Sequence, residues 1–586
     1  MLLSAIYLYR NFETAYESEG NLLMLSRTCA AKARAMLKRW LLFRTGKLAH
    51  CLASFGKPEA IYGQLRCETA LENPTRSFLA KSYLAERLGL ESTYSLALLA
   101  CVFMFSKPDR SKTQSDHLAA DIFSWTQKSK ARALTDLMGV VAQAPASTMK
   151  PIMVSSSAVG LLEDERAILE RLDIASAVEK ITIREELQQH SVKMRESEPL
   201  LVPLLDIREG TSISADQLHI LGKELDDMHH RARGSRGKVV VFEWVYFTAH
   251  NDLQQDLLLL VYRDGLLEHQ IELNIRLEVI EEWVSKELDN PDLKDRPLAS
   301  GGGMAALEKL EALVEPVLDH SNPDDTVIFC PTRALHRIPL HALTPRGGLL
   351  IERNPIHYCQ SLSLLRLCHQ TQSASDASAA FQASVFNTLE YPSGTHDKNP
   401  GRLHVDQIVH TLHTTTITQQ EISKPLFRQR SRTSCVIHVH GHIAFDATNP
   451  LQHHLIPRDP ARSAADRYTA DDIFDTPFRA SALILVMGCG ASAVISTLWK
   501  VGDADCLRFS AAFHPNLMRS MADDAAEPSS SRATVDVAAA FREAVIAARR
   551  NERGRYLSPY SWATFYLHGS GLFPKFFLPH AGAAPS

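Results

Sequence analysis

One stretch of this sequence decides the fold: Val436-Ile437-His438-Val439-His440-Gly441-His442. It reads as a short apolar strand that ends in histidine and glycine. A second stretch of the same kind follows it, Ile484-Leu485-Val486-Met487-Gly488-Cys489-Gly490. In a parallel sheet the carboxyl ends of the strands meet at one edge, and the reactive groups gather there. The two stretches therefore predict an α/β sheet with a histidine and a cysteine at its carboxyl edge.

Other apolar segments supply the rest of this sheet. Short apolar runs alternate with helical or polar pieces, a pattern typical of a largely parallel sheet that is covered on both faces. A hairpin of β-rich runs at Val239–Phe247 and Leu257–Tyr262, with a helix near Val279–Leu288, precedes them. The core strands are expected at Thr326–Cys330, Ser384–Asn387, Cys435–Val439 and Leu483–Met487.

The N-terminal part has a different pattern. From Ala5 to about Gly139 the apolar residues recur with helical periodicity, which predicts an all-α region. Both an irregular helical domain and degenerate tetratricopeptide-type repeats fit this pattern. The predicted organisation is a helical region over 1–142, a partly helical connector over 143–237, and an α/β domain over 238–586 with its core at 326–572.

Composition excludes several classes of protein. The net charge of −4 over 586 residues argues against a general affinity for nucleic acid or anionic membranes. The longest apolar run, Leu96 to Phe105, is about half of a membrane span, and the first residues lack the basic, apolar and small-residue order of a signal peptide. Ten cysteines without a CxxC pair match neither a disulfide framework nor a zinc ribbon. We therefore expect a cytoplasmic or nuclear protein that needs no cofactor.

The paired stretches carry the residue types that cysteine catalysis requires. A thiolate attacks, an imidazole takes and returns the proton, and backbone N–H groups stabilise the oxyanion. Gly441 and Gly490 leave room for a substrate to approach the backbone. A single cysteine at a strand end is more often structural, so the pattern of residues alone leaves both interpretations open.

Six ordered segments resemble the CHAT family of caspase-like cysteine peptidases, relatives of caspases and separases. The resemblance extends over about the last 350 residues and implies a caspase-like, mainly parallel sheet flanked by helices. A helical repeat region ahead of the CHAT domain resembles the arrangement in fungal-type proteins. The segments are Pro331–Leu343, Leu349–Arg353, Tyr358–Leu364, His438–His442 with Asn449-Pro450-Leu451, Leu498-Trp499 and Tyr560–Gly569.

The resemblance also implies roles for individual residues. The catalytic histidine of the family stands immediately before glycine, which selects His440 over His438 and His442, and the cysteine that ends the next core strand is Cys489. His440 is then the general base and acid, and Cys489 is the nucleophile. The backbone amides of Gly441 and Cys489 line the oxyanion hole. His438 shares the side-chain direction of His440 and is expected to be a hydrogen-bonded neighbour.

The sequence departs from the family just after Cys489. Only Cys489-Gly490-Ala491-Ser492 separates the strand-like segments Ile484–Gly488 and Ala493–Trp499, where the family has a loop and a crossover helix. Four extended residues reach about 14 Å, so we expect that these segments are not adjacent parallel strands and that Ala493–Trp499 is displaced or fused. Wrongly joined exons, a shortened pseudoenzyme, or an antiparallel or continuous arrangement would each explain the short junction at Gly490-Ala491.

Two functions follow. The first is a CHAT-family cysteine peptidase that cleaves a protein substrate and is regulated through its helical region. The second is an inactive scaffold for protein–protein interaction, favoured by the short junction. A metal site at His438, His440 and His442 is the remaining alternative for the histidines, but no carboxylate or cysteine stands at a suitable spacing, so no metal is expected. The oligomeric state is left open.

Overall fold

The fold is taken from a computed structural model of the chain. It describes residues 2–19, 21–68, 90–106, 111–130, 146–209, 211–233, 237–248, 255–288, 307–373, 381–387, 400–417, 422–440, 443–444, 454–455, 468–469, 472, 482–483, 493–499, 501–522, 534–550, 554 and 557–574.

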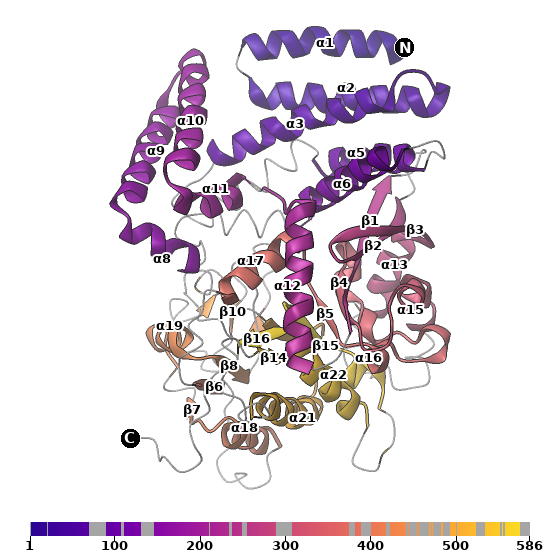
Figure 1. Ribbon diagram of the computed structural model, residues 1–586, viewed down its shortest axis with the longest axis vertical. Coiled ribbons are helices and arrows are strands. Elements are labelled where there is room, and N and C mark those ends of the chain that lie inside the picture. Colours follow the sequence, from indigo (N-terminus) through magenta and orange to yellow (C-terminus); the bar gives the residue numbers. More distant parts are fainter. Residues whose placement is uncertain are drawn as a thin grey trace. The chain divides into compact units, whose positions relative to one another are not determined.

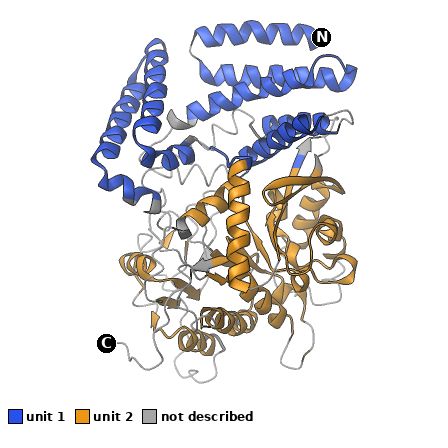
Figure 2. Cartoon of the chain, in the orientation of Figure 1, with its two compact units in different colours: residues 1–215, 246–256 blue, residues 216–245, 257–586 orange. Residues whose placement is uncertain are grey.

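The chain divides into two compact units, which Figure 2 shows in different colours. Unit 1 comprises residues 1–215 and 246–256, and unit 2 comprises residues 216–245 and 257–586. The three-part division expected from the sequence stays a prediction. Within the described ranges, no helix has both the length and the apolar character that crossing a membrane requires.

Every described element of the first 209 residues is helical, which confirms the expected all-α region (Figure 1). Polar residues cap several of these helices: Ser111 forms a capping box with Gln114, and Ser176 forms one with Glu179. Such pairs satisfy backbone N–H groups that a helix start leaves free. The helices are α1 (Leu2–Ser18), α2 (Leu22–Phe43), α3 (Leu48–Glu68), α5 (Leu90–Phe105), α6 (Lys112–Ser129), α8 (Ala146–Val154), α9 (Ser156–Ile174), α10 (Ala177–Ser197) and α11 (Val202–Glu209).

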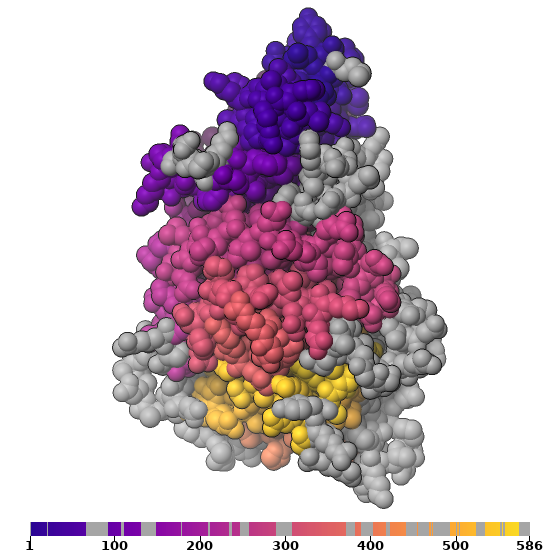
Figure 3. Space-filling view, turned by 90° about the vertical axis from the view of Figure 1, so that its right-hand side faces the viewer, coloured from indigo at the N-terminus to yellow at the C-terminus, as the bar shows by residue number. Residues whose placement is uncertain are grey.

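Helices α1, α2 and α3 pack against one another in chain order, and Figure 3 draws their surface in indigo. Leu25, Cys29 and Ile61 form a buried apolar cluster between them. Glu13 on α1 accepts hydrogen bonds from Lys32 on α2 and Lys57 on α3. Burial opposes the ionisation of Glu13, but the two ammonium groups outweigh it and lower its pKa. The packing suits a repeat array, while the tetratricopeptide assignment stays a prediction.

Unit 2 is built on an 11-stranded sheet in the order β3-β2-β1-β4-β5-β15-β13-β12-β8-β6-β7. Strand β4 pairs in parallel with β1 and β5, and the neighbours β13-β12-β8-β6-β7 also pair in parallel. Strands β13 and β15 are antiparallel. This confirms the expected α/β class. The strands are β1 (Val239–Thr248), β2 (Gln255–Arg263), β3 (Leu266–Arg276), β4 (Thr326–Cys330), β5 (Ile356–Tyr358), β6 (Ala383–Asn387), β7 (Thr416–Ile417), β8 (Val436–His440), β12 (Ala482–Leu483), β13 (Ala493–Thr497) and β15 (Phe565–Gly569).

Smaller elements and helices complete unit 2. Helix α21 packs against both α18 and α22, and α18 also contacts β6. Short strands β9 (Ile443–Ala444), β10 (His454–Leu455) and β11 (Tyr468–Thr469) form a separate sheet, and β14 (Thr534–Asp536) pairs with β16 (Leu572–Pro574). The helices are α12 (Ala215–Arg233), α13 (Leu277–Glu287), α15 (Glu315–His320), α16 (Leu350–Arg353), α17 (Leu362–Ser373), α18 (Pro400–Thr411), α19 (Lys424–Thr433), α21 (Asp503–Ala522), α22 (Val537–Ala548) and α23 (Pro559–Trp562).

The expected displacement or fusion of Ala493–Trp499 is wrong, because this segment forms a strand inside the sheet. The other segment of that expectation, Ile484–Gly488, lies outside the described residues. β12 and β13 are neighbouring parallel strands, with Ala482 opposite Ala493 and Leu483 opposite Val494. β13 lies between β12 and β15, neither displaced nor fused with its neighbour. The register leaves residues 484–492 between the paired positions, and nine residues can span at most about 30 Å, which exceeds the spacing of neighbouring strands.

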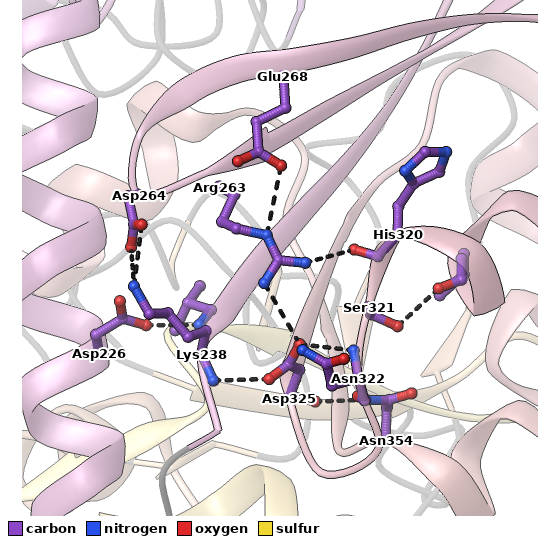
Figure 4. Close-up of polar contacts among 12 residues, drawn as sticks. Asp226, Lys238, Arg263, Asp264, Glu268, His320, Ser321, Asn322, Asp325 and Asn354 are labelled. Carbon is purple, nitrogen blue, oxygen red and sulfur yellow. Dashed lines mark hydrogen bonds and ion pairs between the residues drawn. The ribbon is translucent and has the colours of Figure 1, made fainter.

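A polar network joins α12 and β1 to the rest of the sheet (Figure 4). The Asp325 carboxylate accepts hydrogen bonds from the backbone N–H groups of Lys238 and Asn322, both at 2.8 Å. Asp226 on α12 accepts one from the N–H of Val239, at the start of β1. Burial raises the pKa of Asp226 to about 6. The network binds together segments that lie far apart in the sequence, so α12 and β1 are integral parts of unit 2.

We expect a chain that begins at residue 306 to lose its cooperative fold. It lacks β1, whose buried Phe242 and Trp244 rings lie against Phe329 of β4. The apolar face and the hydrogen-bonding edge of β4 would then be exposed to water. Thermal unfolding followed by near-ultraviolet circular dichroism checks this, with a chain that begins at Asp216 as the control. Equally sharp transitions in both chains would contradict the prediction.

Candidate active site

His440 is the last residue of β8, at the carboxyl edge of the sheet of unit 2. All five residues of β8 are buried, and β6 and β12 pair with its two edges. The register places His440 opposite Asn387, the last residue of β6. The sequence therefore predicted the strand end correctly.

Three other imidazoles gather around β8, and together with His440 they form a histidine cluster. His404 comes from α18, His438 from β8 itself and His514 from α21, and all are buried. The ring centroid of His404 lies 5.1 Å from that of His440 and 5.9 Å from that of His438. The His514 centroid lies 5.3 Å from that of His438. The packing of α18 against α21 brings these rings together.

The imidazoles beside His440 are held in their neutral form. Burial, together with the nearby His440 and His514 rings, lowers the pKa of His404 to about 3. Burial likewise lowers the pKa of His514 to about 4 and that of His438 well below its ordinary value. At neutral pH these three rings place no positive charge next to His440. The site thus provides a buried, uncharged setting for a proton acceptor.

Two residues of the predicted site, Gly441 and Cys489, lie outside the described residues, and so does the neighbouring His442. The separation between Cys489 and His440 is therefore not part of the described geometry. His438 points along the same face as His440, with ring planes 14° apart. The expected hydrogen bond of His438 is wrong for the described part of the chain, because neither ring nitrogen has a partner there. An apolar strand residue would suit this buried position equally well.

Sequence reasoning missed His404 and His514. Both occupy buried positions of amphipathic helices; His404, for example, precedes the buried Ile408 by one turn. That spacing was the available signal, but it predicts burial and gives no contact across the chain. Among the residues that the structure describes, no group of three or more His, Cys, Asp or Glu side chains is arranged to hold a metal ion.

The C-terminal part of the chain matches the CHAT domain family over residues 305–489 and 483–570. Residues 305–570 form a CHAT domain. The two matched parts overlap at 483–489, next to the short junction that the sequence indicated. The network around Asp325 extends the folded unit beyond the matched CHAT residues, to α12 and β1.

Two crystal structures of the Saccharomyces cerevisiae separase–securin complex match with a TM-score of 0.34 and 10% sequence identity. The match covers 98% of this chain and 54% or 53% of those chains, so the chain spans about half their length. No curated protein matches the sequence.

Proposed function

We propose that the CHAT domain is a cysteine peptidase that cleaves a protein substrate. His440 takes the proton of the Cys489 thiol and later returns it to the leaving amine. The thiolate attacks the scissile carbonyl, and the backbone N–H groups of Gly441 and Cys489 stabilise the oxyanion. The helical unit 1 would bind a regulatory protein. A reactive thiol suits a reducing compartment, which favours the cytoplasm, with the nucleus as the alternative.

One observation carries this proposal: the strand that ends in His440 pairs in parallel with the strand that leads toward Cys489. Ile437 of β8 lies opposite Leu483 of β12. If that register continued, His440 would lie level with Val486, and Cys489 follows Val486 by three residues. Both groups would then emerge at the same carboxyl edge, where parallel α/β sheets carry their reactive groups.

A second function has its own support. The match to the family comes in two parts that meet at 483–489, and only residues 484–492 separate the paired positions of β12 and β13. A shortened connection beside the nucleophile removes material that would otherwise wall a substrate pocket. On this alternative the CHAT domain is an inactive scaffold that binds other proteins.

The reactivity of Cys489 distinguishes the two functions. A thiol paired with an imidazole is largely ionised at pH 7, whereas an ordinary thiol with a pKa of about 8.5 is only about 3% ionised. We expect iodoacetamide to alkylate Cys489 roughly 30-fold faster in the wild type than in His440→Ala at pH 7. Mass spectrometry of the peptide that contains residue 489 measures this rate from pH 6 to pH 9.

Cleavage gives the second readout. New N-termini that the wild type generates in a protein mixture should be absent with Cys489→Ala and with His440→Ala, and the double variant should lose no more than either one. His410→Ala is the matched control, because His410 is an exposed histidine on α18. If the alkylation rate of Cys489 in the wild type has the pH dependence of an ordinary thiol, and no cleavage is detected, the scaffold function is supported.

A further inference from the structure

Helix α18 brings a buried ring to the side of His440. His404 is only 1% exposed and lies on the face of α18 that also buries Val405 and Ile408. This helix packs against β6, the strand next to β8, and against α21. A side chain held on both sides in this way keeps a single orientation, because packing removes its alternative rotamers.

The two rings meet edge to face. Their planes are 90° apart and their centroids are 5.1 Å apart, within the range that aromatic pairs prefer. The His438 ring lies on the same side of the strand as His440, with its plane 14° from that of His440. Among the described ring contacts of His440, the one with His404 is perpendicular, and it limits rotation of the His440 ring.

The orientation of this ring matters for the proposed reaction. The second side-chain torsion of histidine has a broad, roughly two-fold energy profile, so an unsupported ring samples several orientations. A general base must point one nitrogen at the group whose proton it takes. A neutral neighbour also adds no repulsion when His440 becomes positively charged, and burial keeps His404 neutral by lowering its pKa to about 3.

We propose that His404 is a positioning residue for His440: it holds the His440 ring in a single orientation, which would serve proton transfer with Cys489. The role in proton transfer rests on the function proposed above. The physical claim is independent of it: the orientation of the His440 ring depends on the His404 ring. No proton passes to His404, and no bond to it forms or breaks.

The test replaces the ring and keeps the volume. In protein labelled with carbon-13 at histidine Cε1, the His440 resonance is identified by its loss in His440→Ala. We expect one narrow resonance in the wild type, several broadened ones in His404→Leu, and one narrow resonance again in His404→Phe, which restores a planar ring. Alkylation of Cys489 at pH 7 should fall about 10-fold in His404→Leu and stay within about two-fold of the wild type in His404→Phe.

The control is His514→Leu, which removes an equally buried ring that lies against His438. It should leave both the His440 resonance and the alkylation rate unchanged, whereas a general loosening of the cluster would alter them. If Cys489 reacts as an ordinary thiol in the wild type, the peptidase proposal fails, and the resonance still decides the positioning role. An unchanged His440 resonance in His404→Leu overturns the positioning role, whatever the reactivity of Cys489.

Discussion

Unit 2 is expected to unfold when the pH falls from 7 to about 5. The cause is a set of histidines, five of them buried and His568 half-buried, that are neutral in the fold. Burial lowers the pKa of each histidine below the ordinary 6.5. It lowers that of His341, for example, to about 3 and that of His514 to about 4. The histidines of the unfolded chain bind protons at a higher pH than those of the folded chain. Their contribution to the free energy of unfolding is therefore fully present above pH 6.5 and is lost as the pH falls toward 4. The residues are His341, His357, His404, His438, His514 and His568.

The expected loss is large compared with the stability of a domain. Each such histidine costs about 1.4 kcal/mol at pH 5.5, one pH unit below its unfolded pKa. The six together reach roughly 8 kcal/mol, while a native domain has about 5–15 kcal/mol in total. Urea unfolding at a series of pH values, followed by near-ultraviolet circular dichroism, measures this dependence.

A matched pair of variants tests the cause. His514→Phe removes one buried titrating ring, so the slope of the unfolding free energy against pH should fall by about 1.4 kcal/mol per pH unit below pH 6. His410→Gln changes an exposed histidine on α18 and should leave the slope unchanged. A free energy of unfolding that stays constant between pH 7 and pH 5 would contradict the prediction.

Replacing Asp536 with alanine should lower the free energy of unfolding by about 4 kcal/mol. Asp536 is buried, accepts hydrogen bonds from Arg233 and His229 of α12, and caps α22 by accepting the N–H of Ala539. Burial opposes its ionisation, but Arg233 and His229 outweigh that effect and hold its pKa well below the usual range. The alanine variant leaves the Arg233 charge without its carboxylate and removes the cap.

Two further variants separate these contributions. Asp536→Asn keeps an oxygen that can cap α22 and loses only the charge, so its loss of stability should be smaller. Glu170→Ala breaks the exposed pair with Arg166 on α9 and should cost less than about 0.5 kcal/mol. Urea unfolding at pH 7.5 measures all three variants, and a loss below about 1 kcal/mol in Asp536→Ala would show that the buried pair does not hold α12.

Much of the fold could be predicted from local pattern. The expected strands at Val239–Phe247 and Thr326–Cys330 correspond to β1 and β4, and the helix near Val279–Leu288 corresponds to α13. The position of His440 at a strand end was also predictable, because a short apolar run followed by His-Gly indicates the end of a strand. These features depend on residues within about ten positions of one another.

The error at the junction has a different origin. The length of an apolar run sets an upper limit on a strand, but the register is decided by the partners, here β8 and β13 on the two sides of β12. The pairing of Ala482 with Ala493 is a contact between partners that no local pattern reveals.

The sequence by itself determined the helical periodicity of the first part, the apolar strands of the second, and the CHAT motifs with His440 before glycine. Only the tertiary structure decided which histidines surround His440, and that α12 belongs with the CHAT sheet through Asp226 and Asp536. The reason is the distance along the chain over which the contacts act. Periodicity and capping act between neighbours in the chain, whereas His404 and His440 meet because two helices and a sheet pack around a shared core, a contact that no spacing in the sequence encodes.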